Sequence, residues 1–523
     1  MEKGAGVSSG IHHVTLITRK VQSNVDFYAG FLGLRLVKQT AGFEDAAQLH
    51  LFYGDAVASP GSLVTFLIWE DGSPGRVGHG AAAEVGFAIS REAIGFWLTR
   101  ALQYGVAATG PVQEFGEPVL RMTDPDGIIV KLIGTSLSGG TTPWVLPGIA
   151  EADAVTRVRS VTLWSEKRRE TAQFFERELG FLPGPEEGSL KRMISSVGDA
   201  IDIRDATGFW TAAPGTGTID HVAFRAPDKA AIEDLHLRLE TSRLGATTVH
   251  DRTYFYSLYV REPAGTLIEV ATDGPGFAVD EALKALGRSV FIPRHFQEDE
   301  TDIRIVLPQF GMPGEQRTVY RDLPFVHRVH VPDNPDGSTL VLFHGTGGNE
   351  TSLLPLGRRL MPNATLIGVR GRSTEEGSAR FFRRLGISRF DQNDIVSESE
   401  ALAAFVEALP EAYGIDLSDA TFIGYSNGAN MLGAAMQLHP DLFRRAVLLR
   451  AIKVLDEPPA SILVDTRVLM LTGASDFYAP YAKGLVQQLS SAGAELEERR
   501  VDAAHDLVEQ DEVVIRDWLP GVI

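Results

Sequence analysis

Residues 11–16 read Ile11-His12-His13-Val14-Thr15-Leu16, a β-branched and apolar run that contains two adjacent histidines. Such a run predicts a β-strand. Two further runs of this kind carry His221 and Glu269. A carboxylate in the middle of an apolar strand is costly unless a neighbouring group compensates its charge. Two histidines and one carboxylate are the ligand set that leaves positions open on non-haem Fe(II), so these three residues predict a mononuclear metal site.

Four segments in the first three fifths of the chain share one order of predicted elements: a strand, an amphipathic helix, and then strands that end in a Gly-apolar motif. They begin near residues 11, 83, 158 and 219. Helices are expected at residues 23–28 in the first segment and 170–179 in the third. Self-similarity at a period of roughly 50–80 residues indicates stacked supersecondary units.

This repeat resembles the vicinal-oxygen-chelate superfamily, whose paired βαβββ modules curl into a cup around a metal. The resemblance covers about residues 8–300. Within it, three stretches look like the ring-cleaving dioxygenases that act on hydroquinones, namely residues 12–15, 34–40 and 261–281. The implied fold is an α+β array of four βαβββ modules, and the implied activity is extradiol-type opening of a substituted hydroquinone ring by dioxygen.

The resemblance also implies roles for individual residues. His13, His221 and Glu269 match the metal ligands, which that subfamily divides between the first and fourth modules. Fe(II) is the implied cofactor, although Mn(II) is compatible with the same ligands, and dioxygen is the co-substrate. In that subfamily other residues hold the substrate and assist proton transfer, and the residues that match them here are His12, Arg252 and Tyr259.

Internal alignment of the repeats identifies a second, pseudo-equivalent site. Ser160 occupies the position of His13, Glu84 that of His221, and Lys131 that of Glu269. These three side chains cannot form a facial triad. We therefore expect Glu84 and Lys131 to approach each other as an ion pair and the chain to hold one working metal site.

The sequence of the repeat is compatible with three other functions. It could cleave catechols as an ordinary extradiol dioxygenase. A glyoxalase-like isomerase would use Zn(II) or Ni(II) with four protein ligands, and Ser160 at the vacated position argues against that. A metal-free module that binds an aromatic compound would not bring the three ligand candidates within about 2.0–2.3 Å of a common point.

The last two fifths of the chain carry a different pattern. A buried-type strand at residues 338–343 is followed by His344-Gly345-Thr346-Gly347-Gly348, and a second strand leads into Gly424-Tyr425-Ser426-Asn427-Gly428 and a helix. Strand, G-x-S-x-G and helix form the nucleophile-elbow context, in which a sharp turn exposes the serine hydroxyl. Glycines are needed on both sides of this turn because strand and helix approach closely.

An acid and a base follow Ser426 in the chain order of α/β-hydrolases. Asp476 lies just past a strand at residues 468–473, and His505 lies in a loop before the last helix. Asp502 and Asp506 are alternative acids. The predicted oxyanion hole uses the backbone N–H groups of Thr346 and Asn427.

This second part resembles the small carboxylesterase/phospholipase branch of the α/β-hydrolase family over residues 322–523, which implies a doubly wound sheet. The hydrolase would cleave an ester or acyl group in the ring-opened product, or would first release the hydroquinone from an ester. A carboxylesterase fused to an isomerase or an aromatic-binding module is the alternative. The expected organisation is modules 1 and 2 in residues 1–150, modules 3 and 4 in 151–307, a Pro- and Gly-rich linker at 308–321, and the α/β-hydrolase domain.

Composition limits the partners of the chain. At 523 residues it is too long for a single core. A formal net charge of -19 argues against nucleic acid and anionic membranes as partners. The absence of cysteine excludes disulfides and thiolate chemistry. We expect a cytoplasmic enzyme that acts on a small aromatic substrate, and a homo-oligomer is compatible with the sequence.

Overall fold

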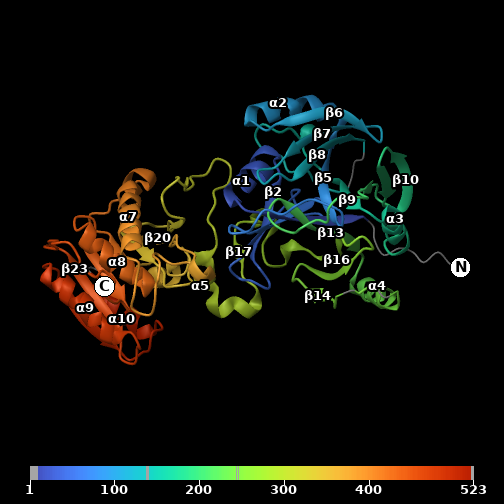
Figure 1. Cartoon of the computed structure of the whole chain (residues 1–523). Helices are drawn as coiled ribbons and strands as arrows, with labels where there is room; N and C mark the ends of the chain where they lie inside the picture. Colours follow the sequence, from blue (N-terminus) through green and yellow to red (C-terminus); the bar gives the residue numbers. More distant parts are fainter. Residues whose placement is uncertain (1–9, 137–139, 243, 246, 520–523) are drawn as a thin grey trace. The chain divides into compact units, whose positions relative to one another are not determined.

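The computed structural model describes residues 10–136, 140–242, 244–245 and 247–519. The chain divides into two compact units, one formed by residues 1–298 and 310–316 and the other by residues 299–309 and 317–523 (Figure 1). We refer to them as the cup unit and the hydrolase unit. Among the described residues, none of the helices is long and apolar enough to cross a membrane.

The cup unit contains the four expected modules. The first comprises β1 (Ile11–Thr18), α1 (Val21–Val25), η1 (Asp26–Phe31), β2 (Arg35–Ala41), β3 (Leu49–Gly54) and β4 (Leu63–Ile68). The second comprises β5 (Ala81–Ser90), η2 (Arg91–Ala93), α2 (Ile94–Tyr104), β6 (Ala108–Glu114), β7 (Glu117–Thr123) and β8 (Ile129–Thr135). In each module a helix follows the first strand, as the sequence pattern predicts.

The third and fourth modules repeat this order after η3 (Glu151–Asp153). The third comprises β9 (Arg157–Ser165), α3 (Arg168–Arg177), β10 (Leu182–Glu187), β11 (Leu190–Ile194) and β12 (Ala200–Asp205). The fourth comprises β13 (Thr218–Ala226), α4 (Lys229–Thr241), β14 (His250–Asp251), β15 (Phe255–Arg261) and β16 (Leu267–Pro275). A closing segment adds η4 (Phe277–Val279), η5 (Leu283–Ala285), β17 (Val290–Phe291) and η6 (Arg294–Asp299).

Within the described residues, the cup unit contains two sheets, and each sheet combines two modules. One sheet has the order β14-β15-β16-β13-β1-β4-β3-β2-β17 and joins the fourth module to the first. The other has the order β10-β11-β12-β9-β5-β8-β7-β6 and joins the third module to the second. In Figure 1, α2, α3 and α4 lie at the outside of these sheets. The expected α+β modules of the vicinal-oxygen-chelate cup are therefore confirmed, with modules 1 and 4 in one sheet.

The hydrolase unit is a seven-stranded, mostly parallel sheet with helices on both faces. Its strands are β18 (His327–His330), β19 (Thr339–Phe343), β20 (Thr365–Val369), β21 (Thr421–Tyr425), β22 (Arg445–Leu449), β23 (Arg467–Gly473) and β24 (Glu495–Val501), in the order β18-β20-β19-β21-β22-β23-β24. Its helical segments are α5 (Glu300–Val306), α6 (Leu354–Leu360), η7 (Glu375–Gly377), α7 (Gln392–Tyr413), α8 (Asn427–Leu438), α9 (Ala479–Ser491) and α10 (Glu509–Trp518). The α/β-hydrolase architecture expected from the sequence is confirmed.

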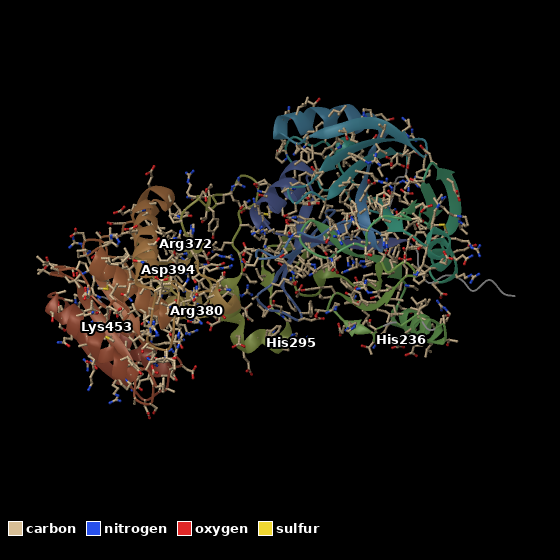
Figure 2. All side chains as sticks on the ribbon, in the orientation of Figure 1. His236, His295, Arg372, Arg380, Asp394 and Lys453 are labelled. Carbon is tan, nitrogen blue, oxygen red and sulfur yellow. The ribbon has the colours of Figure 1, made fainter. Side chains whose placement is uncertain are left out.

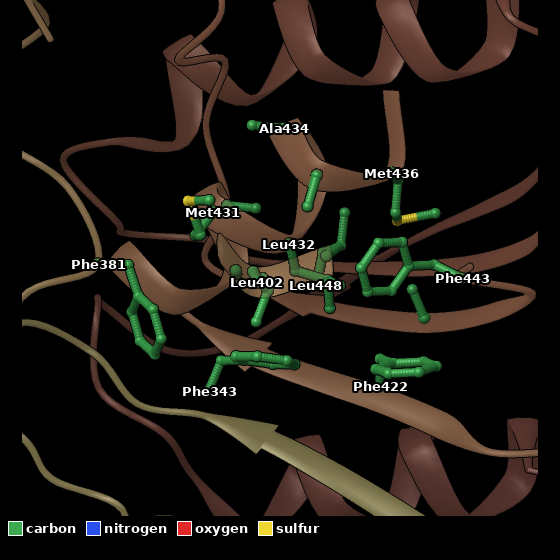
Figure 3. Close-up of a cluster of buried hydrophobic side chains, with 14 of the residues drawn as sticks. Phe343, Phe381, Leu402, Phe422, Met431, Leu432, Ala434, Met436, Phe443 and Leu448 are labelled. Atoms are coloured by element: carbon green, nitrogen blue, oxygen red, sulfur yellow. The ribbon is translucent and has the colours of Figure 1, made fainter. Parts of the chain in front are cut away.

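Two apolar layers hold the hydrolase sheet between its helices. On one face, α7, α8 and α9 bury residues such as Leu402, Leu432 and Leu485. Figure 3 shows part of this layer, in which Phe343 and Phe422 of the sheet lie beneath α8. On the other face, α5, α6 and α10 pack against the sheet. Helices on both faces explain why the central strands read as continuous apolar runs.

The boundary between the units differs from the expected linker at residues 308–321. Helix α5, assigned from the sequence to the fourth module, belongs to the hydrolase unit because its buried Ile305 joins the α6–α10 layer. Residues 310–316 belong to the cup unit, where Gly311 exchanges two hydrogen bonds of 2.9 Å with the amide of Gln22. The Pro and Gly content of this stretch indicated a linker, but it did not reveal these specific contacts.

Candidate functional site

His13, His221 and Glu269 are brought together by the strand register of the first sheet. Thr15 lies opposite His221 across the antiparallel pair β1–β13, and His13 lies opposite Ala223. Ala223 in turn pairs with Glu269 across the parallel pair β13–β16. Side chains two residues apart in a strand share a face, so all three predicted ligands project from the same face of the sheet.

The donor atoms of these residues converge on one point. Glu269 Oε2 lies 3.0 Å from Nε2 of His13 and 3.0 Å from Nε2 of His221. All three side chains are buried, yet neither oxygen of Glu269 accepts a hydrogen bond from a described residue. Ligand atoms that each lie about 2.1 Å from an ion and about 90° apart are about 3.0 Å from one another. The residues therefore fit a metal ion that two histidines and one carboxylate would hold.

The electrostatics of the site favour a cation. Burial raises the pKa of Glu269, but His13 and His221 outweigh this and hold it well below the usual range. Glu269 is therefore ionised at neutral pH. Burial lowers the pKa of His221, but Asp220 and Glu269 together raise it to about 9. Two carboxylates thus create a negative potential at the point where the donor atoms meet.

Both histidines have a partner on the ring nitrogen that faces away from this point. Nδ1 of His221 lies 2.7 Å from Oδ2 of Asp220, and Nδ1 of His13 lies 2.9 Å from Nδ1 of His12. Such contacts fix the tautomer and orientation of a ligating imidazole. Asp220 was not predicted from the sequence, although its position beside His221 offered a signal.

His12 contacts Nδ1 of His13, on the side of the His13 ring that faces away from Glu269. Strict strand alternation would place the two side chains on opposite faces of the sheet. However, β1 has a bulge here, since Ile11 and His13 lie opposite the consecutive residues Phe224 and Ala223. His12 is the extra residue of this bulge. Burial and the neighbouring His13 lower the pKa of His12 to about 3, so the ring is neutral.

Tyr259 lies beside the candidate metal centre, and Arg252 lies beside Tyr259. Tyr259 is the cross-strand partner of Glu269, and its ring centroid is 5.5 Å from that of His221. Burial and Glu269 raise the pKa of Tyr259 far above the usual range, so its hydroxyl keeps the proton. The Arg252 guanidinium lies 5.8 Å from the centroid of the Tyr259 ring and 5.7 Å from that of Phe43.

Several aromatic rings lie close to the centre. The Phe255 ring packs 5.4 Å from His12 and 5.5 Å from His13, and it belongs to an apolar cluster with Phe52 and Phe277. Nε2 of His295, a residue labelled in Figure 2, lies 2.9 Å from the carbonyl oxygen of Phe43. An aromatic lining of this kind suits a flat apolar ring.

His50 is a site residue that the sequence prediction missed. Its Nε2 lies 3.0 Å from the hydroxyl of Thr65, which in turn lies 2.8 Å from the hydroxyl of Thr15. Burial, followed by His13 and His221, lowers the pKa of His50 to about 3, so its ring is neutral. Its position in β3, where leucines alternate on the other face, was the available signal.

The second sheet repeats this register with different residues. Gly86 lies opposite Ser160, and Glu84 lies opposite Thr162, across β5 and β9. Gly86 pairs with Lys131 across β5 and β8. Ser160, Glu84 and Lys131 therefore occupy the places of His13, His221 and Glu269, as the internal alignment predicted.

The predicted ion pair is present at this second position. Nζ of Lys131 lies 3.0 Å from Oε2 of Glu84, and the hydroxyl of Thr162 links the two through bonds of 3.0 and 3.1 Å. Arg121 and Glu114 extend the network. Burial raises the pKa of Glu84, but Lys131 and Arg121 lower it on balance.

Replacing Lys131 by methionine is expected to destabilise the cup unit by about 3 kcal/mol, because Glu84 loses the nearer of its two cationic partners and only Arg121 remains beside it. The measurement is urea unfolding followed by tryptophan fluorescence. The double variant K131M/E84Q should recover most of the loss, since it buries no unpaired charge. Equal midpoints for K131M and the unsubstituted chain would contradict this account of the network.

In the hydrolase unit, Ser426, His505 and Asp476 form a hydrogen-bonded chain. Nε2 of His505 lies 2.8 Å from the Ser426 hydroxyl, and Nδ1 lies 2.9 Å from Oδ2 of Asp476. Among the three candidate acids, Asp476 is therefore the one whose carboxylate contacts His505. Its second oxygen accepts the backbone N–H of Tyr478 at 2.8 Å.

Ser426 occupies the sharp turn between β21 and α8. Its backbone has φ of 51° and ψ of -113°, which is strained for a residue with a side chain. A Cβ at Gly424 would lie 2.6 Å from Cα of Ala429, and one at Gly428 would lie 2.3 Å from the carbonyl oxygen of Phe343. Both flanking positions therefore require glycine, as the motif predicted.

The predicted oxyanion-hole residues lie on two segments beside this turn. Asn427 is the first residue of α8, and the His344-Gly345-Thr346 segment passes so near that a Cβ at Gly345 would lie 3.5 Å from Cβ of Ser426. Gly428 donates to the carbonyl of His344 at 3.1 Å. Within the described part of the chain, no group accepts the backbone N–H of Thr346 or of Asn427, which leaves both available to an oxyanion.

The two parts of the chain are similar to different known proteins. Residues 10–132 match the Glyoxalase/Bleomycin resistance protein/Dioxygenase superfamily. The chain is 34% identical over 296 residues to the "Putative ring-cleaving dioxygenase MhqO" of Bacillus subtilis, and the aligned residues cover 56% of this chain and 94% of that protein. It is 29% identical over 294 residues to the "Chlorohydroquinone/hydroquinone 1,2-dioxygenase" of Sphingobium indicum, which covers 54% and 90%.

The remaining part of the chain has relatives of its own. The "Putative hydrolase MhqD" of Bacillus subtilis is 32% identical over 197 residues, which is 36% of this chain and 94% of that protein. A Bacillus subtilis crystal structure described as a "putative dioxygenase" is 33% identical and superposes with a TM-score of 0.57 over 59% of this chain and 99% of its own. The chain therefore belongs to the ring-cleaving dioxygenases of the glyoxalase/dioxygenase superfamily, fused to a member of the MhqD-like hydrolases.

Proposed function

We propose that the cup unit opens the ring of a substituted hydroquinone with dioxygen, using Fe(II) held by His13, His221 and Glu269. The convergence of the two imidazole nitrogens on a carboxylate that accepts no hydrogen bond from the described residues carries the proposal. The Sphingobium relative, whose name specifies hydroquinone and chlorohydroquinone, supports the substrate class. When bound, Fe(II) supplies open positions for a phenolic oxygen and for dioxygen.

The shape of a hydroquinone determines what the side chains around the centre must bind. A hydroquinone has its hydroxyls at opposite ends of the ring, so only one can reach the metal and the other must be held by side chains. The protonated Tyr259 hydroxyl and the Arg252 guanidinium can donate hydrogen bonds to oxygens near the centre. His12 acts instead on His13, whose Nδ1 it contacts, and keeps that ring oriented.

His50 is suited to hold the far hydroxyl of the substrate. Its Nε2 is engaged by Thr65. A neutral imidazole presents one donor and one acceptor, so Nδ1 remains for a ligand. The Phe52 ring, whose centroid lies 4.1 Å from that of His50, would flank the substrate ring.

Replacing His50 by phenylalanine is expected to weaken hydroquinone binding about tenfold, the value of one hydrogen bond. Binding of 4-methylphenol, which has no second hydroxyl, should change little. The measurement is competitive inhibition by the two phenols, and Leu67→Ala on the neighbouring strand serves as a control for repacking. An equal loss of affinity for both phenols would assign His50 to packing rather than to hydroxyl recognition.

Oxygen uptake tests the ring-cleaving function. Anaerobically Fe(II)-loaded protein is given methylhydroquinone or catechol, and dioxygen consumption is recorded with an electrode. We expect consumption with methylhydroquinone. Consumption with catechol alone would place the chain among ordinary extradiol dioxygenases. No consumption with either, despite bound metal, would favour an isomerase or an aromatic-binding module.

We further propose that the hydrolase unit is a serine esterase that acts on an ester or acyl compound related to the aromatic substrate. The hydrogen-bonded chain from Asp476 through His505 to Ser426 supports this proposal. His505 would remove the proton of Ser426 as the hydroxyl attacks an acyl carbon and would then deliver it to the leaving group. The N–H groups of Thr346 and Asn427 would stabilise the oxyanion.

A further inference from the structure

Arg450 has a fully buried guanidinium in the hydrolase unit. It is the residue immediately after β22, and its side chain is 0% exposed. A buried guanidinium is unfavourable unless its donors are satisfied. Its surroundings therefore indicate what the residue does.

The Arg450 guanidinium binds the backbone on both sides of His505. Nε donates to the carbonyl of Ala504 at 3.2 Å, and Nη2 donates to the carbonyl of Asp506 at 2.8 Å. These carbonyls flank the residue whose imidazole contacts Ser426. The side chain of His505 is itself 34% exposed, so packing alone holds it weakly. The orientation of this ring depends on the backbone of its loop.

A carboxylate fixes Arg450 in this position. Asp511, in the first turn of α10, accepts two hydrogen bonds of 2.8 Å from Nη1 and Nη2. One of its oxygens also accepts the backbone N–H of Val508 at 2.9 Å. The side chain of Asp511 is 1% exposed. A bidentate pair of this kind sets both the distance and the orientation of the guanidinium.

The backbone of Arg450 links the strands that carry the other two members of the catalytic chain. Its N–H donates to the carbonyl of Leu471 in β23 at 2.8 Å, and the preceding Leu449 accepts the N–H of Ser426 at 2.8 Å. Arg450 has a φ of 57°, an unusual value for a residue other than glycine. A strained backbone at a site surrounded by catalytic residues indicates a functional constraint.

We propose that Arg450 is the positioning residue of the hydrolase, which holds the backbone on both sides of His505 so that its ring stays aligned with Asp476 and Ser426. This inference rests on the proposed serine-esterase function. The bonds to Ala504 and Asp506 perform the alignment, and Asp511 keeps Arg450 in place for them. Small misplacements of a catalytic base reduce the rate strongly because the reacting groups no longer meet in the productive geometry.

The decisive experiment separates an effect of Arg450 on the catalytic rate from an effect of the buried ion pair on stability. The double variant R450M/D511L removes both charges together, and such replacements often preserve stability. We expect this variant to melt near the temperature of the unsubstituted chain. Its kcat for p-nitrophenyl acetate should fall about 100-fold, the loss that a shift of about 1 Å produces, while KM stays within about twofold. R445M, at the other end of the same strand, is the matched control and should retain full activity.

A second variant covers the case in which R450M/D511L does not fold. R450K keeps the charge beside Asp511 but loses the forked donors, so its kcat should also fall at constant KM. An unchanged kcat in a folded R450M/D511L or in R450K would overturn the proposal and assign the pair to anchoring α10 alone. If the unsubstituted chain hydrolyses no ester, or if S426A hydrolyses it equally well, the esterase function fails and the role of Arg450 fails with it.

Discussion

Replacing His13 by alanine is expected to lower the affinity of the cup unit for Fe(II) by more than about 100-fold. Loss of a group that merely orients a ligand already costs about 10- to 100-fold, so loss of a ligand should cost more. The buried Glu269 and His221 would remain, but two donors hold an ion less tightly than three. The measurement is metal content per chain after anaerobic loading and gel filtration, together with oxygen consumption.

The matched control for this variant is Ser160→Ala. Ser160 occupies the position of His13 in the second sheet, where Glu84 and Lys131 form an ion pair. Metal content should therefore be unchanged in S160A at one ion per chain. Retention of full metal content in H13A, or loss of metal in S160A, would contradict the assignment of the site to the first and fourth modules.

Replacing Ser426 by alanine should reduce ester hydrolysis by a factor of about 10⁴ or more, since the nucleophile and its base act as a unit. Hydrolysis of p-nitrophenyl acetate gives the rate, and mass spectrometry after fluorophosphonate treatment shows whether the covalent adduct is lost. Ser475→Ala is the control, because among the described residues Ser475 bonds to the loop of His505 through its backbone N–H, which donates to the carbonyl of Ala503 and is kept in the variant.

The two variants also test whether the activities are independent. H13A should hydrolyse esters at the rate of the unsubstituted chain, and S426A should consume dioxygen at the unsubstituted rate, because each site lies within its own compact unit. A loss of both activities in either single variant would show that the two reactions are coupled.

The fold could be predicted from the sequence to the level of modules and their order. The repeat positions of His13, His221 and Glu269 were specific enough to identify the pseudo-equivalent residues, and the observed strand register agrees with them. Strand alternation determines which residues share a face, so a correct internal alignment also predicts which side chains meet. The ion pair of Glu84 and Lys131 followed from this reasoning.

The parts that could not be predicted depend on local irregularity and long-range contacts. The orientation of His12 results from a β-bulge, which regular alternation does not reveal. His50 reaches the site only because β3 and β4 place it beside Thr65. The sequence around Arg450 shows only a residue that follows a strand. Its role depends on the hydrogen bonds that the carbonyls of Ala504 and Asp506, more than 50 residues away, accept from it.

The boundary of the units was missed for a similar reason. Helix α5 follows the acidic end of the cup unit in sequence, and nothing in its composition shows which core it joins. Ile305 packs with the hydrolase layer, whereas Gly311, five residues beyond the end of α5, bonds to Gln22. Composition identifies stretches that connect domains, but packing decides where each domain begins.

The mass of the product formed from methylhydroquinone by Fe(II)-loaded protein tests the central claim most directly. Opening of the ring by dioxygen predicts a non-aromatic product heavier than the substrate by two oxygen atoms, absent with H13A. A product lighter by two hydrogen atoms, accompanied by hydrogen peroxide, would contradict the account, since it would show oxidation to a quinone without ring cleavage.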